Sequence, residues 1–265
     1  MPRRTDDGGR TVLGRVPTRT RRPTTSAVAL GLMALGVGAF VVLLPSVSDA
    51  CQPATTPVSA HAEAALDPGS RVLIVGDSYT TGRGSSDGNH GWAQMISENE
   101  SWRSTIDGIP GSGYVNRAAT DSVQNTYLPR IESHADLDPD LVLVQGSQND
   151  WTVSTRELRK VVTATLRQAE EQWPDALVVA IGPSAPAPLA TATTNISDAV
   201  GAGARAAGVP YVDAVDAQWF TEFNSRSYAA ADGEHLDDAG YRYLARRIAA
   251  SLHDLTETTA ECQPS

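Results

Sequence analysis

The 265-residue chain contains only two cysteines, Cys51 and Cys262. Their wide separation excludes a structural zinc site, which needs four ligands in closely spaced pairs. The two residues bracket the region after residue 50, and the termini of a folded domain often lie close together. We therefore expect a Cys51–Cys262 disulfide if this region reaches an oxidising compartment. The alternatives are two unrelated thiols, or a lipid attached to Cys51.

The chain also lacks a calcium loop. Asp136, Asp138 and Asp140 alternate as the first ligands of such a loop do, but Leu141 occupies the position that requires glycine. The glutamate that completes the loop is missing as well. We expect these carboxylates to lie in a solvated turn before a strand, and we expect no metal.

Basic residues are scarce after residue 50. Seven of the 21 basic and three of the 31 acidic residues precede residue 51, which leaves 14 basic and 28 acidic residues after it. The net charge of this region is therefore −14. Because nucleic acids are bound through basic patches that contact phosphates, this charge argues against a nucleic-acid partner. It does not restrict neutral substrates.

The N-terminal segment differs from the rest. Residues 1–25 hold seven arginines, and the next 19 residues, SAVALGLMALGVGAFVVLL, carry no charge. This pattern predicts a signal peptide or signal anchor over residues 26–50, with the basic end in the cytoplasm. Small residues at 48 and 50 favour cleavage, whereas the length of the apolar run favours an anchor. We expect the remainder to be secreted or membrane-anchored, outside the cytoplasm, with membrane contact through this segment alone.

The exported region shows no internal repeat and no second domain. Residues 51–68 are rich in Pro, Ala and Thr and are interpreted as a linker. We expect one folded domain over residues 69–258, followed by a short tail at 259–265.

Short apolar runs alternate with amphipathic stretches in this domain. The runs predict buried strands at 72–75, 141–145, 176–181 and near 211–212, with a further short strand near 104–106. Helical spacing of apolar residues predicts helices over 155–173, 196–207 and 238–252. Such alternation is typical of the α/β class, with a central parallel sheet covered on both faces. Ligands bind at the carboxyl ends of the strands in such sheets.

Two serines in the stretch VLIVGDSYTTGRGSSDG are candidate nucleophiles. Ser86 matches the G-x-S-x-G pattern, which works only where a strand ends in a sharp turn. Its neighbours are Gly, Ser, Asp and Asn, a composition typical of a loop. Ser78 instead follows four apolar residues and the turn Gly76-Asp77. We therefore predict Ser78 as the nucleophile.

A serine nucleophile needs a base, a group that orients the base, and donors for an oxyanion. His235 lies in a polar turn with Asp232 three residues before it, so the carboxylate can hold one ring nitrogen while the other faces the serine. Asn149 follows a predicted strand and is a candidate donor. The glycine turn in DGIPGSGYVN can expose a backbone N–H at Gly111 or Gly113.

These segments together resemble the SGNH, or GDSL-like, hydrolase superfamily. The four blocks are Gly76-Asp77-Ser78-Tyr79, the glycine turn, Gly146-x-x-Asn149-Asp150 and Asp232-x-x-His235, and they follow the family's order over about residues 70–255. The resemblance implies a flavodoxin-like three-layer α/β/α sandwich. It also implies an ester hydrolase or acyltransferase that needs no cofactor.

The resemblance assigns a role to each of these residues. Ser78 becomes the nucleophile, His235 the base and Asp232 its orienting partner. The oxyanion donors become the Ser78 N–H, the Gly111 N–H, preferred over that of Gly113, and the Asn149 side chain. The residue before Asn149 departs from the threonine common in the family, which leaves the asparagine assignment intact.

We therefore expect an exported serine esterase that acts on short-chain or carbohydrate-linked acyl esters. No long apolar insertion is present that could serve as a lipase lid. A lipase or acyltransferase using the same site is the alternative, and a non-catalytic surface binding module is opposed by the complete set of motif residues. Trp92 and Trp151 flank the motif loops, and Trp151 is the better candidate for lining a sugar or acyl pocket.

Overall fold

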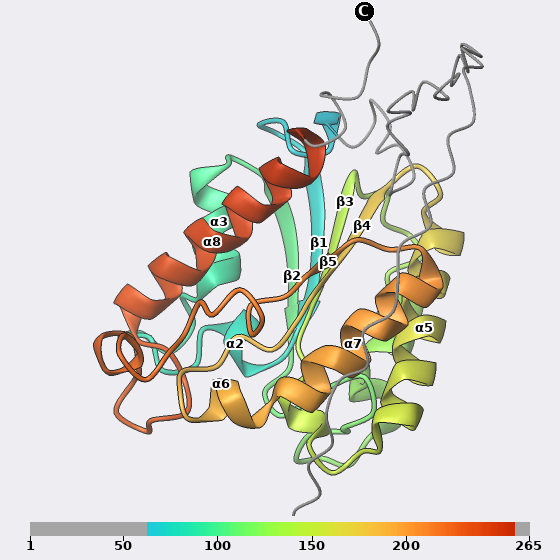
Figure 1. The fold of residues 1–265 in the computed structure, drawn as a ribbon. Helices are drawn as coiled ribbons and strands as arrows, with labels where there is room; N and C mark the ends of the chain where they lie inside the picture. Colours follow the sequence, from blue (N-terminus) through green and yellow to red (C-terminus); the bar gives the residue numbers. More distant parts are fainter. Residues whose placement is uncertain (1–62, 258–265) are drawn as a thin grey trace, which may run out of the picture. The chain divides into compact units, whose positions relative to one another are not determined.

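A five-stranded parallel sheet lies at the centre of the computed structural model, which describes residues 63–257 (Figure 1). The strand order is β2-β1-β3-β4-β5. The strands are β1 (Arg71–Gly76), β2 (Arg103–Gly108), β3 (Leu141–Gln145), β4 (Leu177–Ile181) and β5 (Tyr211–Val212). All neighbouring pairs are parallel. The predicted parallel sheet of an α/β protein is therefore confirmed.

The two faces of the sheet are covered by different helices. In Figure 1, α3 (Trp92–Asn99) and α8 (Asp238–Glu257) lie on one side of the sheet. The other side carries α4 (Tyr127–Ser133), α5 (Thr155–Gln172) and α7 (Thr194–Ala207). This arrangement gives the expected three layers of helix, sheet and helix.

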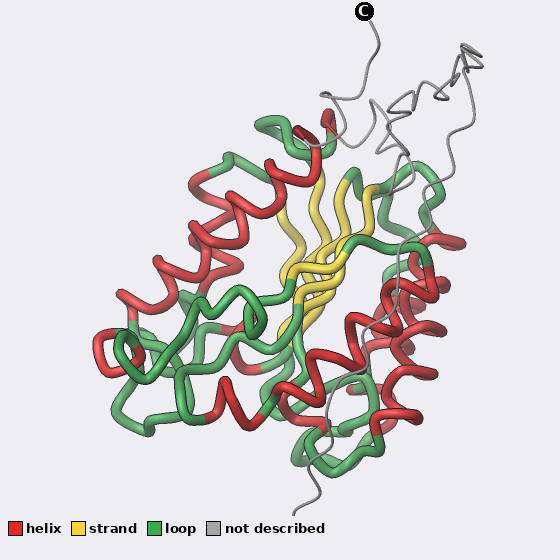
Figure 2. Tube along the Cα trace, viewed as in Figure 1, coloured by secondary structure: helices red, strands yellow, loops and turns green. Residues whose placement is uncertain are grey.

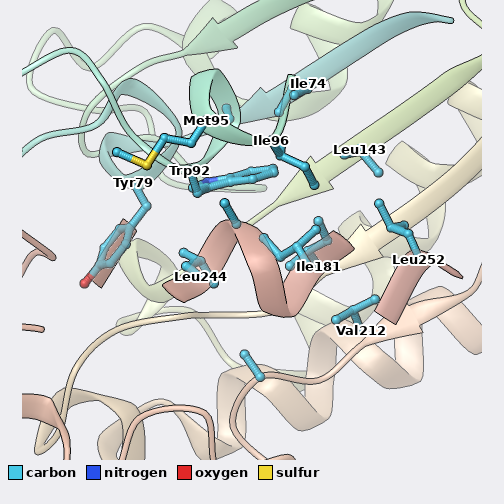
Figure 3. Packing of buried hydrophobic residues seen from close by; sticks show 14 of the residues in the cluster. Ile74, Tyr79, Trp92, Met95, Ile96, Leu143, Ile181, Val212, Leu244 and Leu252 are labelled. Atoms are coloured by element: carbon cyan, nitrogen blue, oxygen red, sulfur yellow. The ribbon is translucent and has the colours of Figure 1, made fainter. Parts of the chain in front are cut away.

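Side chains along β1 alternate between these two layers. Ile74 belongs to the apolar cluster that includes Trp92 of α3 and Leu244 of α8, shown in Figure 3. Leu73 belongs to the opposite cluster, with Leu158 of α5 among its members. Successive side chains of a strand point to opposite faces, so a strand buried on both sides must be apolar throughout. This explains why β1 appears in the sequence as a continuous apolar run.

Several short elements were not expected from the sequence. They are α2 (Ser78–Thr81), α6 (Leu189–Ala192) and the 3-10 turns Val123–Asn125, Gln148–Asp150 and Ser225–Ser227. Helix α3 has apolar residues at Trp92, Met95 and Ile96, but its eight residues are too few for a reliable helical period. Helices α2 and α6 lie among the loops that gather at the carboxyl ends of the strands, as comparison of Figure 1 with Figure 2 shows.

The predicted signal or anchor segment and both cysteines lie outside the described residues. Within residues 63–257, no helix is long and apolar enough to cross a bilayer.

Candidate active site

Ser78 lies directly beyond the carboxyl end of β1, as the first residue of α2. The Asp77 carboxylate caps this helix by accepting a hydrogen bond from the Tyr79 N–H at 2.9 Å. Gly76 leaves no room for a side chain, since a Cβ there would lie 2.0 Å from the Thr80 hydroxyl oxygen. The strand therefore turns abruptly into the short helix. Ser78 is 5% exposed at this turn.

His235 joins Ser78 to Asp232 through two hydrogen bonds. Its Nε2 lies 2.9 Å from the Ser78 Oγ, and its Nδ1 lies 2.7 Å from the Asp232 Oδ2. The other Asp232 oxygen accepts from the backbone N–H groups of Glu234 and His235, both at 2.9 Å. Ser78, His235 and Asp232 are thus joined by consecutive hydrogen bonds, although 157 positions separate the serine from the histidine.

The Asp232 carboxylate is held in its charged form. Partial burial raises its pKa, but the backbone N–H groups of His235 and Glu234 and the His235 ring outweigh burial and lower the pKa to about 2. Asp232 is therefore an anion at neutral pH. A fixed anion at Nδ1 orients the ring so that Nε2 faces the serine.

Tyr79 supports the histidine from the helix that carries the serine. The Tyr79 and His235 rings lie 5.3 Å apart between centroids. The Tyr79 hydroxyl donates a hydrogen bond to the backbone carbonyl of Glu234. The same short helix therefore presents the nucleophile and braces the loop that carries the base. No role was predicted for Tyr79 from the sequence, although it follows Ser78 directly.

The glycine turn after β2 adopts the geometry of a type II β-turn over residues 109–112. The Ser112 N–H donates to the Ile109 carbonyl at 3.1 Å, Pro110 occupies the second position, and Gly111 has φ +79°. Proline at the second position and glycine at the third are the residues that this turn prefers. The turn sits beside the nucleophile because the Ile109 N–H donates to the Gly76 carbonyl at 3.1 Å.

The structure distinguishes Gly111, inside this turn, from Gly113, directly after it. The Gly113 N–H donates to the Asn116 carbonyl at 3.0 Å and is therefore occupied. The Gly111 N–H donates to no partner among residues 63–257, and the same holds for the Ser78 N–H. Gly113 has a packing role instead, since a Cβ there would lie 2.6 Å from the Asp150 Oδ2.

Asn149 follows β3 and reaches toward both turns. Its Nδ2 donates to the Ser112 carbonyl at 2.8 Å and lies 3.4 Å from the Asp77 Oδ2. The second contact is long for a hydrogen bond. One N–H of the amide is thus weakly engaged and lies between the end of β1 and the glycine turn.

Asp150 organises the backbone around these donors. Its buried carboxylate accepts from the N–H groups of Tyr114, Val115 and Asn116 at 2.9, 3.1 and 2.7 Å. Burial raises the pKa of this carboxyl group, although the hydrogen bonds oppose that effect. Asp150 belongs to the block that contains Asn149, but no function was predicted for it from the sequence. Its position directly after Asn149 was the available signal.

The second candidate serine and the chain's other four histidines lie elsewhere. Ser86 is in an exposed loop, where its N–H donates to the Asp238 carboxylate at 2.8 Å. The Nε2 atoms of His90, His134 and His253 lie 3.3, 3.0 and 3.5 Å from carboxylate oxygens of Glu98, Asp107 and Glu100 respectively. His61 lies outside the described residues.

The two tryptophans beside the motif loops have opposite environments. Trp92 is fully buried in the core, which excludes it from a substrate pocket. Trp151 is 76% exposed and follows the 3-10 turn that contains Asn149.

Comparisons with known proteins agree on one family. Residues 74–243 match the model of the GDSL-like lipase/acylhydrolase family. A GDSL lipase of Mycobacterium tuberculosis is 31% identical over 187 residues, which are 67% of this chain and 79% of that protein.

Two solved structures are similar in fold. A lipase/acylhydrolase from Enterococcus faecalis has 17% identity and a TM-score of 0.52, over 74% of this chain and 98% of that one. A family two carbohydrate esterase from Clostridium thermocellum, in complex with cellohexaose, has 14% identity and a TM-score of 0.54, over 71% of this chain and 65% of that one.

Proposed function

Since this chain belongs to the GDSL-like lipase/acylhydrolase family and is an ester hydrolase, we propose that it cleaves its substrate with a triad of Ser78, His235 and Asp232. The observation that carries the proposal is the pair of hydrogen bonds, 2.9 and 2.7 Å long, that links serine, histidine and aspartate. A serine with a base within hydrogen-bond reach, itself oriented by a third group, is the arrangement that nucleophilic catalysis requires.

In the proposed reaction, the Ser78 Oγ attacks the ester carbonyl carbon as the His235 Nε2 takes the hydroxyl proton. The Asp232 carboxylate stabilises the imidazolium that forms. The tetrahedral intermediate then collapses, the bond to the alcohol oxygen breaks, and His235 returns the proton to the departing alcohol. Water, deprotonated by His235, attacks the acyl-enzyme and releases the acid and free Ser78.

The oxyanion of the intermediate is proposed to lie among the N–H groups of Ser78, Gly111 and the Asn149 side chain. Two features support this assignment. The backbone N–H groups of Ser78 and Gly111 have no partner in the described part of the chain. The contact of the Asn149 amide with Asp77 is 3.4 Å long, so substrate can replace it at little cost.

We propose a short-chain or carbohydrate-linked acyl ester as the substrate. The similarity in fold to an esterase solved with cellohexaose is compatible with a carbohydrate. The exposed Trp151 side chain, two residues after Asn149, offers a flat apolar face on which a sugar ring can pack. Cleavage of long-chain lipids and transfer of the acyl group to another acceptor remain the alternatives with the same triad.

Export is a further part of the proposal. The arginine-rich segment and the uncharged run before residue 50 support secretion or anchoring, with the hydrolase domain outside the cytoplasm. A Cys51–Cys262 disulfide is proposed on the same basis. Cell fractionation, followed by mass measurement after alkylation with and without reduction, tests both statements.

The first experiment is hydrolysis of a chromogenic ester series from acetyl to palmitoyl, and of an acetylated polysaccharide, by the full chain in mild detergent. We expect turnover of the short esters and the polysaccharide, and none by the Ser78→Ala variant. Ser86→Ala is the matched control and should be unaffected. A preference for long chains would favour the lipase alternative, and activity that survives in Ser78→Ala would refute the triad.

A further inference from the structure

Arg130 is a buried cation that the proposed mechanism does not use. It belongs to α4, and the residue is 4% exposed. Its guanidinium contacts the end of β1, the end of β2 and the glycine turn. We infer that Arg130 is a positioning residue, which holds the turn of Gly111 in place beside the turn of Ser78. The inference rests on the proposed function, because it concerns the geometry of the oxyanion site.

The first set of contacts joins the nucleophile's strand to the glycine turn. One terminal nitrogen of Arg130 donates to the Gly76 carbonyl and to the Ser112 Oγ, both at 3.0 Å. Gly76 lies two residues before Ser78, and Ser112 directly follows Gly111. The Ser112 hydroxyl in turn donates to the Ile109 carbonyl at 2.7 Å, inside the turn. A single nitrogen atom therefore links the two segments whose N–H groups are proposed to bind the oxyanion.

The second set of contacts fixes the guanidinium itself. Its other terminal nitrogen lies 2.9 Å from the Asp107 Oδ1, and its Nε lies 3.2 Å from the Asp107 Oδ2. The same terminal nitrogen also donates to the Asp107 backbone carbonyl. Asp107 lies on β2, two residues before the turn begins at Ile109. The His134 Nε2 contacts the same carboxylate at 3.0 Å. The charge is thus paired, as a buried charge must be.

An arginine suits this position for a geometric reason. The guanidinium is a rigid planar group with five N–H donors, whereas a lysine ammonium is a single point with three. Here the plane also lies over the Tyr127 ring, 5.4 Å from its centroid. Lysine would preserve the charge but could not reach Asp107, Gly76 and Ser112 together. The spacing between the end of β1 and the glycine turn would then relax.

The consequence falls on the transition state more than on substrate binding. An oxyanion donor acts only when it lies at the position that the developing charge will occupy. If the Gly111 N–H shifts relative to the Ser78 N–H, the tetrahedral intermediate loses stabilisation while the bound ester is little affected. A loss confined to the transition state lowers kcat and kcat/KM equally.

The test substitutes lysine for two arginines of the full chain that pair with carboxylates in the same way. Arg71 lies at the opposite end of β1 and is also bidentate to an aspartate, Asp140, at 2.8 and 3.2 Å. We expect Arg130→Lys to lower kcat by about 10- to 100-fold with KM within about twofold, since a whole oxyanion donor is worth about 10²–10³. Arg71→Lys should leave both constants unchanged.

A second readout separates positioning from general damage to the fold. Phenylboronic acid binds a catalytic serine as a tetrahedral adduct, in which the Ser78 oxygen bonds to boron and the proton passes to His235. Its inhibition constant should rise in Arg130→Lys by about the same factor as kcat falls, because both depend on the oxyanion donors. Rates are expressed per active site, counted by covalent labelling with a fluorophosphonate, so that unfolded molecules do not contribute.

Ser112→Ala provides a milder variant if Arg130→Lys does not fold. It removes only the hydroxyl that accepts from Arg130 and leaves every backbone N–H in place. We expect a several-fold loss of kcat at constant KM. The loss in the double variant with Arg130→Lys should be smaller than the product of the two single losses, because the two residues share one contact.

Several results would overturn the inference. The inference fails if kcat is unchanged in Arg130→Lys and in Ser112→Ala. It also fails if only KM changes, or if kcat falls while the inhibition constant of the boronate stays the same. These outcomes differ from failure of the proposed function, in which the unmodified chain itself hydrolyses no ester or the Ser78→Ala variant stays active.

Discussion

Replacement of Asp232 by asparagine tests the triad at its most exposed member. Asparagine keeps an oxygen for the N–H groups of Glu234 and His235, both of which lie 2.9 Å from the Asp232 Oδ1, so the turn should persist. The substitution removes the charge that faces His235 and places an amide N–H donor at its Nδ1, where the carboxylate accepted. The expected effect is therefore a loss of stabilisation of the imidazolium and a shift of the ring proton to Nε2, where it blocks the base, without loss of the loop's structure.

The size of the electrostatic rate loss follows from the distance between Asp232 and His235 and from the exposure of the Asp232 side chain. The Oδ2 of Asp232 lies 2.7 Å from the Nδ1 of His235, and the Asp232 side chain is 41% exposed. Two unit charges whose centres are about 4 Å apart attract by about 1 kcal/mol in water and about 4 kcal/mol at the effective dielectric of a protein surface. That range corresponds to a factor of about 5 to 10³ in rate, and half exposure places the electrostatic part of the loss near 10².

The assay is acetyl ester hydrolysis by Asp232→Asn and by a matched control, Asp237→Asn. Asp237 lies in the same loop and accepts a backbone N–H from Gly240 at 2.8 Å. We expect kcat to fall by about 10²- to 10⁴-fold in the first variant, the larger value reflecting the wrong ring tautomer, and to be unchanged in the control. The loss should remain smaller than in Ser78→Ala. Because the Asp232 pKa is about 2, the carboxylate of the wild type is charged throughout an assay above about pH 4.

The same lowered pKa has a small effect on stability. The pKa of Asp232 is lower in the folded protein than the 3.8 of a free carboxyl group, so its charge stabilises the fold above that value. This contribution disappears as the pH falls toward 2. Solvent screening of the exposed side chain keeps it below about 1 kcal/mol. Full activity in Asp232→Asn, or an equal loss in Asp237→Asn, would refute the assignment of Asp232.

Three further predictions concern neighbouring residues. Gly111→Ala should lower the free energy of unfolding by about 1–2 kcal/mol in urea titrations, because φ +79° is unfavourable for a residue with a Cβ. Crowding adds nothing, since the atom nearest to that Cβ would be 3.6 Å away. An unchanged free energy of unfolding would mean that the turn relaxes freely. Burial raises the pKa of Asp77 to about 7, so between about pH 4 and 7 this carboxyl group is neutral in the folded protein and ionised in the unfolded chain. The free energy of unfolding of the wild type should therefore decline as the pH rises from about 4 to 7. Asp77→Asn should therefore gain stability relative to wild type as the pH rises through that interval, and a difference independent of pH would contradict the raised pKa. Trp151→Ala should raise KM for an acetylated polysaccharide several-fold but not for p-nitrophenyl acetate, since a ring contact is worth about 1 kcal/mol; equal effects on both substrates would exclude a sugar contact, with Phe223→Ala, 98% exposed, as the control.

Local sequence was sufficient to predict the structure around a residue wherever that structure depends on the residue's immediate neighbours in the chain. The apolar run before Gly76 predicts a strand buried on both faces, and the glycine and aspartate after it predict an abrupt turn at Ser78. The same reasoning rejects Ser86, whose pattern matches a nucleophile motif but which no strand precedes. Local periodicity also accounts for the parallel sheet and for the three long helices α5, α7 and α8.

The choice between Gly111 and Gly113 could not be made in this way. Both glycines lie in the short segment Gly111-Ser112-Gly113 and have almost the same neighbours in sequence. They differ because the Gly113 N–H is taken by the Asn116 carbonyl, and because the Gly113 backbone packs against Asp150. The second contact crosses from the loop after one strand to the loop after another.

The sequence by itself therefore determined the fold class, the family and the segments that carry the candidate triad, because periodicity, turn residues and motif spacing are properties of short stretches of chain. Only the tertiary structure decided which atoms meet. Pairing of β1 with both β2 and β3 brings Ser78, the glycine turn and Asn149 to one edge of the sheet. Arg130 had no local signal at all, because its role depends on contacts with Asp107, Gly76 and Ser112, which only the paired strands bring together.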